Sequence, residues 1–80
     1  MSSAVADMVA TLARGLVDNP AGVEVREGSE GPTTVLSLHV AEGDVGQVIG
    51  RGGRVARGLR SVVRAAGIAR GERYQLEIVD

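Results

Sequence analysis

The stretch VGQVIGRGGRVARGLRSVVRAAG, residues 45–67, decides the fold of this chain. Within it, "GRGG" at 50–53 separates two segments with helical patterns, a short one at 45–49 and a longer one at 54–66. Glycine has no Cβ, so it adopts positive φ angles and lets another backbone approach closely. The four residues therefore predict a tight turn that joins two helices.

The longer of these two helices is amphipathic. On a helical wheel its apolar side chains form one stripe, and three arginines cluster on the opposite side. We expect the stripe to pack on a sheet, the arginines to face solvent, and the helix to end near Gly67. The stripe consists of Val55, Leu59, Val62, Val63 and Ala66, and the arginines are Arg57, Arg60 and Arg64.

The segments before this stretch predict another helix and a hairpin. Residues 4–17 form an amphipathic helix that Ser2 or Ser3 could cap and that ends before Pro20. Residues 23–27 and 33–40 alternate as half-buried strands do, and the turn-forming "GSEGP" lies between them. The apolar positions of the first helix are Val5, Met8, Val9, Leu12 and Leu16.

The remaining segments complete the predicted fold. Asp44 and Gln47 have the spacing of a capping box at the start of the short helix. Residues 73–79 alternate again and predict a third strand, which should run parallel to 33–40 because two helices connect them. The order α-β-β-α-α-β predicts an α+β fold. Its three-stranded mixed sheet should have residues 33–40 at the centre and the helices on one face.

The charges of the chain are strongly segregated, although the formal net charge is only −1. Six arginines and no acid lie between Val45 and Gly71. The rest of the chain holds three arginines and all ten acids. A basic segment of this kind favours a polyanionic partner such as nucleic acid.

The composition excludes several other classes of protein. There is no cysteine, and the N-terminal residues lack the pattern of a signal peptide or a transmembrane span. His39 is the only histidine and lysine is absent, so catalytic groups are few. Tyr74 is the only aromatic residue, and we expect it to pack in the fold. We therefore expect a cytoplasmic, non-catalytic protein with no membrane segment, metal or cofactor.

The turn at 50–53 lies immediately before the N-terminus of the longer helix. Free backbone N–H groups and the helix dipole favour an anion at such a point. Arg51 and Arg54 flank it and can form charge-assisted hydrogen bonds with phosphate oxygens. The turn is therefore well suited to receive a phosphodiester backbone.

The residues "VIGRGG" resemble the signature loop of KH domains, in which a Val-Ile-Gly-x-x-Gly segment joins two helices. The element order resembles the type II arrangement of that fold. The chain length and the segments "LVDNP", "VIGRGGR" and "LEIVD" resemble the small bacterial single-KH RNA-binding proteins of the KhpA, or YlqC-like, family. The resemblance covers residues 5–79 and implies one KH domain over residues 1–80. Gly52 stands where the family often carries a larger polar residue, which should loosen the loop.

The resemblance also implies which residues bind RNA. The GxxG loop of the family clamps the backbone of about four nucleotides. The middle of the second strand, residues 36–40, would face the bases in part, and Arg60 and Arg64 are secondary candidates because they lie farther from the loop. The implied RNA-binding residues are Gly50, Arg51, Gly52, Gly53, Arg54 and Arg57, with Val48 and Ile49 supporting an apolar floor.

The biological setting is likewise implied by the resemblance alone. The family suggests an RNA chaperone or post-transcriptional regulator that binds single-stranded RNA, and KH domains also bind single-stranded DNA. Members of the family are linked to cell shape and envelope growth. They self-associate and pair with a larger RNA-binding protein of the Jag family. A homodimer and such a partner are therefore expected here.

Three other functions fit parts of the sequence. A protein-interaction module with a KH fold and little RNA binding is the main alternative, although the intact GxxG loop and its arginines argue against it. A nucleotide-dependent enzyme lacks the lysine of a Walker A loop, and Val55 occupies the third glycine position of GxGxxG. Helix-turn-helix binding of DNA is disfavoured by the glycine-rich turn and the flanking strands.

Overall fold

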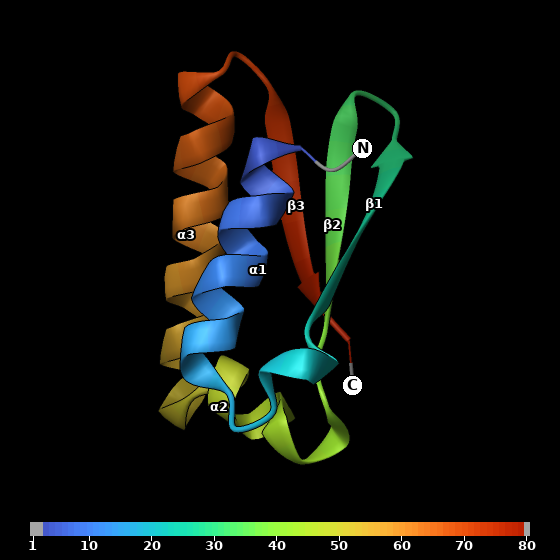
Figure 1. Ribbon diagram of the computed structural model, residues 1–80. Helices are drawn as coiled ribbons and strands as arrows, with labels where there is room; N and C mark the ends of the chain where they lie inside the picture. The colour runs from blue at the N-terminus through green and yellow to red at the C-terminus, as the bar shows by residue number, and fades with distance from the viewer. Residues whose placement is uncertain (1–2, 80) are drawn as a thin grey trace.

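The computed structural model describes residues 3–79 of the chain (Figure 1). Short 3-10 turns connect several of its helices and strands. The order helix, strand, strand, helix, helix, strand confirms the predicted α+β class. The elements are α1 Ala4–Leu16, β1 Glu24–Glu30, β2 Thr33–His39, α2 Val45–Ile49, α3 Arg54–Ala69 and β3 Arg73–Ile78.

The three strands form one mixed sheet in the order β1-β2-β3. β1 runs antiparallel to β2, with Glu27 opposite Leu36. β3 runs parallel to β2, with Leu76 opposite the same Leu36. This register confirms that β2 is the central strand and that the connection through α2 and α3 joins two parallel strands.

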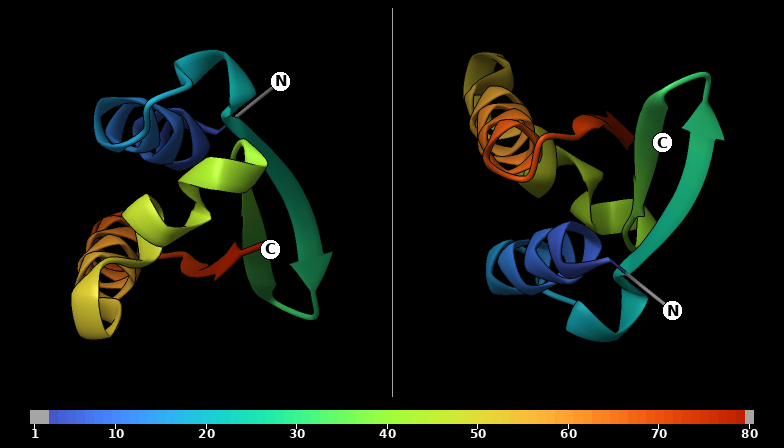
Figure 2. Two further views of the ribbon diagram at one scale, coloured as in Figure 1. Left: turned by 90° about the horizontal axis from the view of Figure 1, so that it is seen from below. Right: turned by 90° about the horizontal axis from the view of Figure 1, so that it is seen from above.

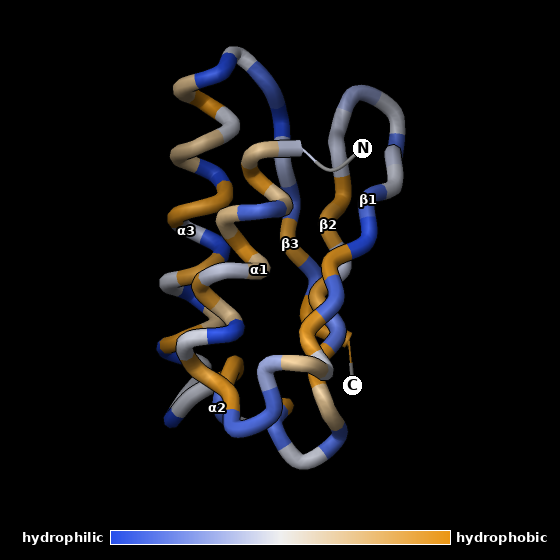
Figure 3. Tube along the Cα trace, viewed as in Figure 1, coloured by the Kyte–Doolittle hydropathy of each residue, from blue (hydrophilic) through white to orange (hydrophobic). Residues whose placement is uncertain are grey.

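The helices form a layer on one face of this sheet, as predicted. Seen along the long axis of the molecule, α1 and α3 lie on the same side of the strands (Figure 2). The core between the two layers is aliphatic, and its largest fully buried side chains are Leu36, Leu38, Val9, Val48 and Val63. In Figure 3 the hydrophobic residues of the hairpin gather toward α2, whereas the turn between β1 and β2 is hydrophilic.

The buried faces of the two long helices differ from the predicted stripes. Leu12 and Leu16 of α1 remain 40% and 39% exposed, and Val62 of α3 remains 42% exposed. Small side chains are buried in their place, because they allow a helix axis to lie close to its neighbours. These smaller buried residues are Ala6, Ala10 and Ala13 in α1 and Ala56 and Gly67 in α3.

Ser3 fixes the start of α1. Its Oγ accepts a hydrogen bond from the backbone N–H of Ala6 at 3.0 Å, as an N-cap does. Its own backbone N–H donates to Oε1 of Glu27 at 2.7 Å, and hydrogen bonds from Ser3 lower the pKa of that carboxyl. Ser3 therefore caps α1 and also ties it to β1. Ser2, the other predicted cap, lies outside the described residues.

Two elements extend past their predicted ends. α3 continues through Gly67 to Ala69. A Cβ at Gly67 would lie 2.8 Å from the carbonyl oxygen of Glu72 and 3.0 Å from Cδ2 of Tyr74, so this glycine permits close packing and does not end the helix. β1 continues to Glu30, so the hairpin turn is confined to residues 31–32.

The predicted capping box at the start of α2 is wrong. The side chain of Asp44 makes no capping hydrogen bond. It is buried, and its Oδ2 accepts a hydrogen bond from the backbone N–H of Asn19 at 3.0 Å. Gln47 accepts from the backbone N–H of Asp18 at 3.3 Å and donates to its carboxylate at 3.2 Å. Both side chains therefore brace α2 against the segment that follows α1.

Candidate nucleic-acid interface

Three glycines with positive φ angles form the turn between α2 and α3. Gly50 ends α2 with φ 75° and ψ 172°, a region of backbone space that is essentially restricted to glycine. Gly52 has φ 63°, and Gly53, with φ 76°, is the N-cap of α3. The N–H of Gly53 donates to the carbonyl oxygen of Gly50 at 3.1 Å. The GRGG segment is therefore a compact, hydrogen-bonded loop.

This loop has a packed side and an open side. A Cβ at Gly50 would overlap the side chain of Val55 and lie 3.0 Å from its backbone nitrogen. A Cβ at Gly52 would meet nothing within 4 Å, and one at Gly53 would approach only the guanidinium of Arg57, at 3.7 Å. Packing therefore requires glycine at position 50, whereas the side at Gly52 and Gly53 leaves room for a ligand backbone.

Three arginines lie beside the loop. Arg51 and Arg54 are exposed on either side of the two open glycines. Arg57, one turn further along α3, donates from Nη1 to the carbonyl oxygen of Gly52 at 3.0 Å. We expected Gly52 to loosen the loop, and this hydrogen bond instead ties the loop tip to the helix.

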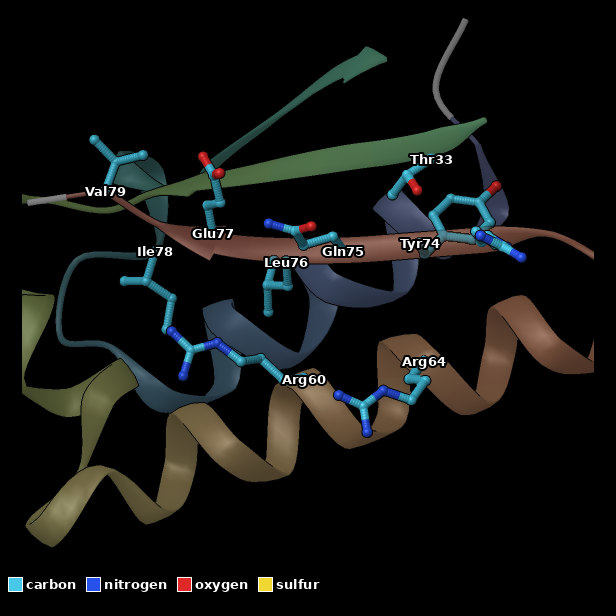
Figure 4. A pocket seen from close by; sticks show the side chains of 10 residues that line it. Thr33, Arg60, Arg64, Tyr74, Gln75, Leu76, Glu77, Ile78 and Val79 are labelled. Atoms are coloured by element: carbon cyan, nitrogen blue, oxygen red, sulfur yellow. The ribbon is translucent and has the colours of Figure 1, made fainter. Parts of the chain in front are cut away.

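A groove lies between α3 and β3 (Figure 4). Arg60 and Arg64 line it from the helix, and β3 together with the following Val79 lines it from the sheet. Because β3 pairs only with β2, its other edge is free of strand pairing. Within residues 3–79, neither Arg60 nor Arg64 forms a salt bridge, so both guanidinium groups are available to a ligand.

The structure separates the predicted site residues by exposure. Arg54 and Arg57 lie together with the loop residues at one end of the molecule. Ile49 is partly exposed beside them. Val48 is fully buried, so it can only support the loop from beneath.

The prediction that residues 36–40 face the bases is wrong for Leu36 and Leu38. Both are fully buried, because β2 is the central strand and the helices cover that face. The strand that lines the groove with α3 is the edge strand β3.

The sequence favours a secondary role for Arg60 and Arg64 and a packing role for Tyr74, yet all three line the groove. The spacing of Arg57, Arg60 and Arg64 by three and four residues already places them on one side of α3. The sequence does not reveal that this side of α3 lies beside β3, because the helix and the strand come together only when the chain folds.

Residues 3–79 contain no cluster of three or more His, Cys, Asp or Glu side chains that could hold a metal ion. Over the same residues, none of the helices is both long enough and apolar enough to cross a membrane.

Comparison with known sequences identifies a family. A family model described as "KhpA/KhpB, KH domain" matches residues 6–78. A Treponema pallidum protein named "RNA-binding protein KhpA" is 45% identical over 74 residues, which is 92% of each chain. The protein of the same name from Aquifex aeolicus is 42% identical over 78 residues, covering 98% of this chain and 99% of the relative. Its Mycobacterium tuberculosis counterpart is 41% identical over 80 residues, covering 100% of this chain and 96% of the relative.

Comparison with solved structures gives the same fold. Aquifex aeolicus Era, in its crystal structure bound to GDP and AlF4−, matches with a TM-score of 0.61 and 17% identity. The match covers 92% of this chain and 29% of the Era chain, and at this identity it shows the fold alone. The family model, the near full-length relatives and the α-β-β-α-α-β architecture agree, and the chain belongs to the KhpA/KhpB family of KH domains.

Proposed function

We propose that this protein binds single-stranded RNA, without catalysing a reaction, at the GxxG loop and in the groove between α3 and β3. The observation that carries the proposal is the open side of the loop, where Gly52 and Gly53 leave space beside the exposed Arg51 and Arg54. The curated relatives cited above are named as RNA-binding proteins, and none of their names describes an enzyme.

The RNA backbone would be held at the start of α3. This helix has 16 residues. Its N-cap is Gly53, which has no side chain to accept a hydrogen bond from the first turn. The N–H of Arg54 already donates to the carbonyl oxygen of Arg51, but the N–H groups that follow it and the helix dipole favour a phosphate oxygen at this point. Arg51 and Arg54 can add charge-assisted hydrogen bonds to neighbouring phosphates.

The nucleotides beyond the clamped phosphate would lie between α3 and β3. Arg60 and Arg64 supply positive charge along the helix wall. The free edge of β3 offers backbone donors and acceptors that a base edge can satisfy. Ile78 is partly exposed and lines the same groove, so it offers an aliphatic surface to a base.

The test is a charge reversal on the open side of the loop, Arg51→Asp combined with Gly52→Asp. Binding of fluorescein-labelled, random-sequence RNA hexamers is measured by fluorescence anisotropy at low salt. We expect the affinity to fall by at least about tenfold, because the change removes one cation and places two carboxylates against phosphates. The slope of log K against log salt should also become shallower, by about 0.7 for each phosphate that the variant no longer neutralises.

The chain contains a matched control for this variant. Arg14 and Gly15 form the same dipeptide on α1, and both are exposed. Arg14→Asp with Gly15→Asp therefore gives a protein of identical composition and net charge. Circular dichroism and thermal melting establish that both variants are folded. If both lose affinity equally, the loss reflects net charge, and the loop is not the binding site. If the loop variant binds like the wild type, the protein-interaction module becomes the better hypothesis.

We further propose that the protein self-associates, as the resemblance implies. The exposed Leu12 and Leu16 lie one turn apart on α1, and the exposed Val62 lies on α3. With Ile68 of α3, which is 72% exposed, they are the large exposed hydrophobic side chains of residues 3–79, and all of them lie on the two long helices. Exposed apolar side chains on this layer favour a contact between copies. Sedimentation velocity should show a dimer that weakens in Val62→Asp, and a monomer at every concentration would contradict this proposal.

The remaining expectations stay predictions from the resemblance. They are the role as RNA chaperone or post-transcriptional regulator, the link to cell shape, the partner of the Jag family and the use of single-stranded DNA. The cytoplasmic location stays a prediction from the composition.

A further inference from the structure

We propose that Tyr74 is a base-stacking platform at the end of the groove that lies far from the GxxG loop. Single-stranded RNA would then be held at two places, by its backbone at the loop and by a base at Tyr74. This inference rests on the proposed function, because it requires a strand that enters the groove.

Tyr74 is the single aromatic residue of the chain. It lies near the start of β3, its side chain is partly exposed, and it lines the groove together with Arg64 and Thr33 (Figure 4). One part of the ring packs on Gly67, where a Cβ would lie only 3.0 Å from Cδ2 of the tyrosine. The absence of a side chain at Gly67 therefore seats the ring against α3, and the part that the core leaves uncovered belongs to the groove.

Packing on Gly67 holds the ring in this position, and one exposed hydrogen bond adds to it. The hydroxyl of Tyr74 donates to Oε2 of Glu72 at 3.3 Å, and Oε1 of the same carboxylate accepts from Nε of Arg70 at 3.3 Å. A side chain that is already fixed loses little conformational freedom when a ligand binds. The ring is therefore preorganised for contact.

The surroundings of Tyr74 suit a nucleotide. Aromatic side chains stack on bases with little regard to sequence, because every base has a π face. Arg64 and Arg73 line the same groove and can meet the phosphates of a strand whose base stacks on Tyr74. A base at this end of the groove would thus stack on an aromatic surface, and its phosphates would lie near cations.

The distance between the two contact points makes the inference testable by RNA length. From Arg54 at the loop to Gly67 beneath the ring, α3 rises by about 20 Å at 1.5 Å per residue. A strand clamped at the loop reaches Tyr74 only if it continues along the groove for several nucleotides. A short RNA should bind the loop alone, and a longer one should bind both places.

The experiment uses Tyr74 as its own probe, since the chain has no tryptophan and no other tyrosine. Random-sequence RNA hexamers and trinucleotides are titrated into the wild type at equal nucleotide concentration, and tyrosine emission is recorded. We expect hexamers to quench the emission and trinucleotides to leave it unchanged apart from their absorption. By anisotropy, Tyr74→Leu should bind labelled hexamers about tenfold more weakly than the wild type.

Two controls distinguish the loss of base stacking from a disturbance of the fold. Tyr74→Phe keeps the ring and loses the hydroxyl, so it should bind hexamers within about twofold of the wild type. Tyr74→Leu should bind trinucleotides as the wild type does, which also shows that its loop is intact. Hexamer binding without quenching, or with equal affinity for the wild type and Tyr74→Leu, would overturn this inference alone. A folded wild type that binds no hexamer would overturn the proposed function and this inference with it.

Discussion

Gly50 and Gly52 lie two residues apart in one loop and both have positive φ angles, yet their surroundings are opposite. The position of a Cβ at Gly50 is occupied by Val55, whereas at Gly52 the same position is open space. Gly50 is thus needed to close α2 onto α3, and Gly52 leaves the outside of the loop bare. In this loop, glycine permits close packing on the inner side and leaves room for a ligand on the outer side.

The same contrast occurs within α3. A Cβ at Gly58 would meet nothing within 4 Å, whereas one at Gly67 would press on Glu72 and Tyr74. Gly67 makes room for the ring at one end of the groove, as Gly50 makes room for Val55 at the other. The role of each glycine is therefore decided by what lies next to its missing side chain, which the spacing of glycines in the sequence does not reveal.

The largest expected effect is that of Gly50→Ala. Alanine at φ 75° and ψ 172° is strained, and its Cβ would overlap Val55, so we expect a loss of about 3 kcal/mol in the free energy of unfolding. Gly52→Ala has the cost of a left-handed residue without any overlap, which is about 1 kcal/mol. Urea unfolding of the two variants measures the difference. Equal losses would contradict the division of the loop into a packed and an open side.

Much of the fold could be predicted from the sequence because its signals are local. Alternating strands at 23–27 and 33–40, helical periodicity at 54–66 and glycines at 50, 52 and 53 give the element order. Two helices between strands then give parallel pairing. The errors arise where distant contacts override local signals. Gly67 resembles a helix end in the sequence, but Tyr74 packs on it and α3 continues.

The same distinction between local signals and distant contacts applies to the candidate site. The loop could be predicted because its glycines and arginines are adjacent in the chain, and its role in RNA binding stays a proposal. The strand that lines the groove could not, because it depends on which side of α3 lies beside β3. The predicted stripe assigned Val62 to the core, yet the helix is rotated so that Ala56 and Gly67 are buried and Val62 is exposed. Arg60 and Arg64 line the groove as part of this arrangement.

The smallest expected effect sharpens the open side of the loop. Arg57→Ala removes the hydrogen bond from the guanidinium to the carbonyl oxygen of Gly52. Because this bond is exposed, we expect a loss of no more than about 1 kcal/mol in the free energy of unfolding. The loop itself should respond more visibly. The N–H of Gly53, which donates to Gly50, should exchange with solvent up to about fivefold faster, the equivalent of ~1 kcal/mol of local opening.

Arg60→Ala is the matched control for this last variant, because it removes the same side chain from the same helix at a position without a hydrogen bond to the loop. It should leave the exchange of the Gly53 N–H unchanged while still weakening RNA binding through the loss of a groove cation. If exchange at Gly53 is equally fast in the wild type and in Arg57→Ala, Arg57 does not hold the loop tip. The open side would then be rigid through its glycine backbone alone, and Arg57 would act only as a charge beside it.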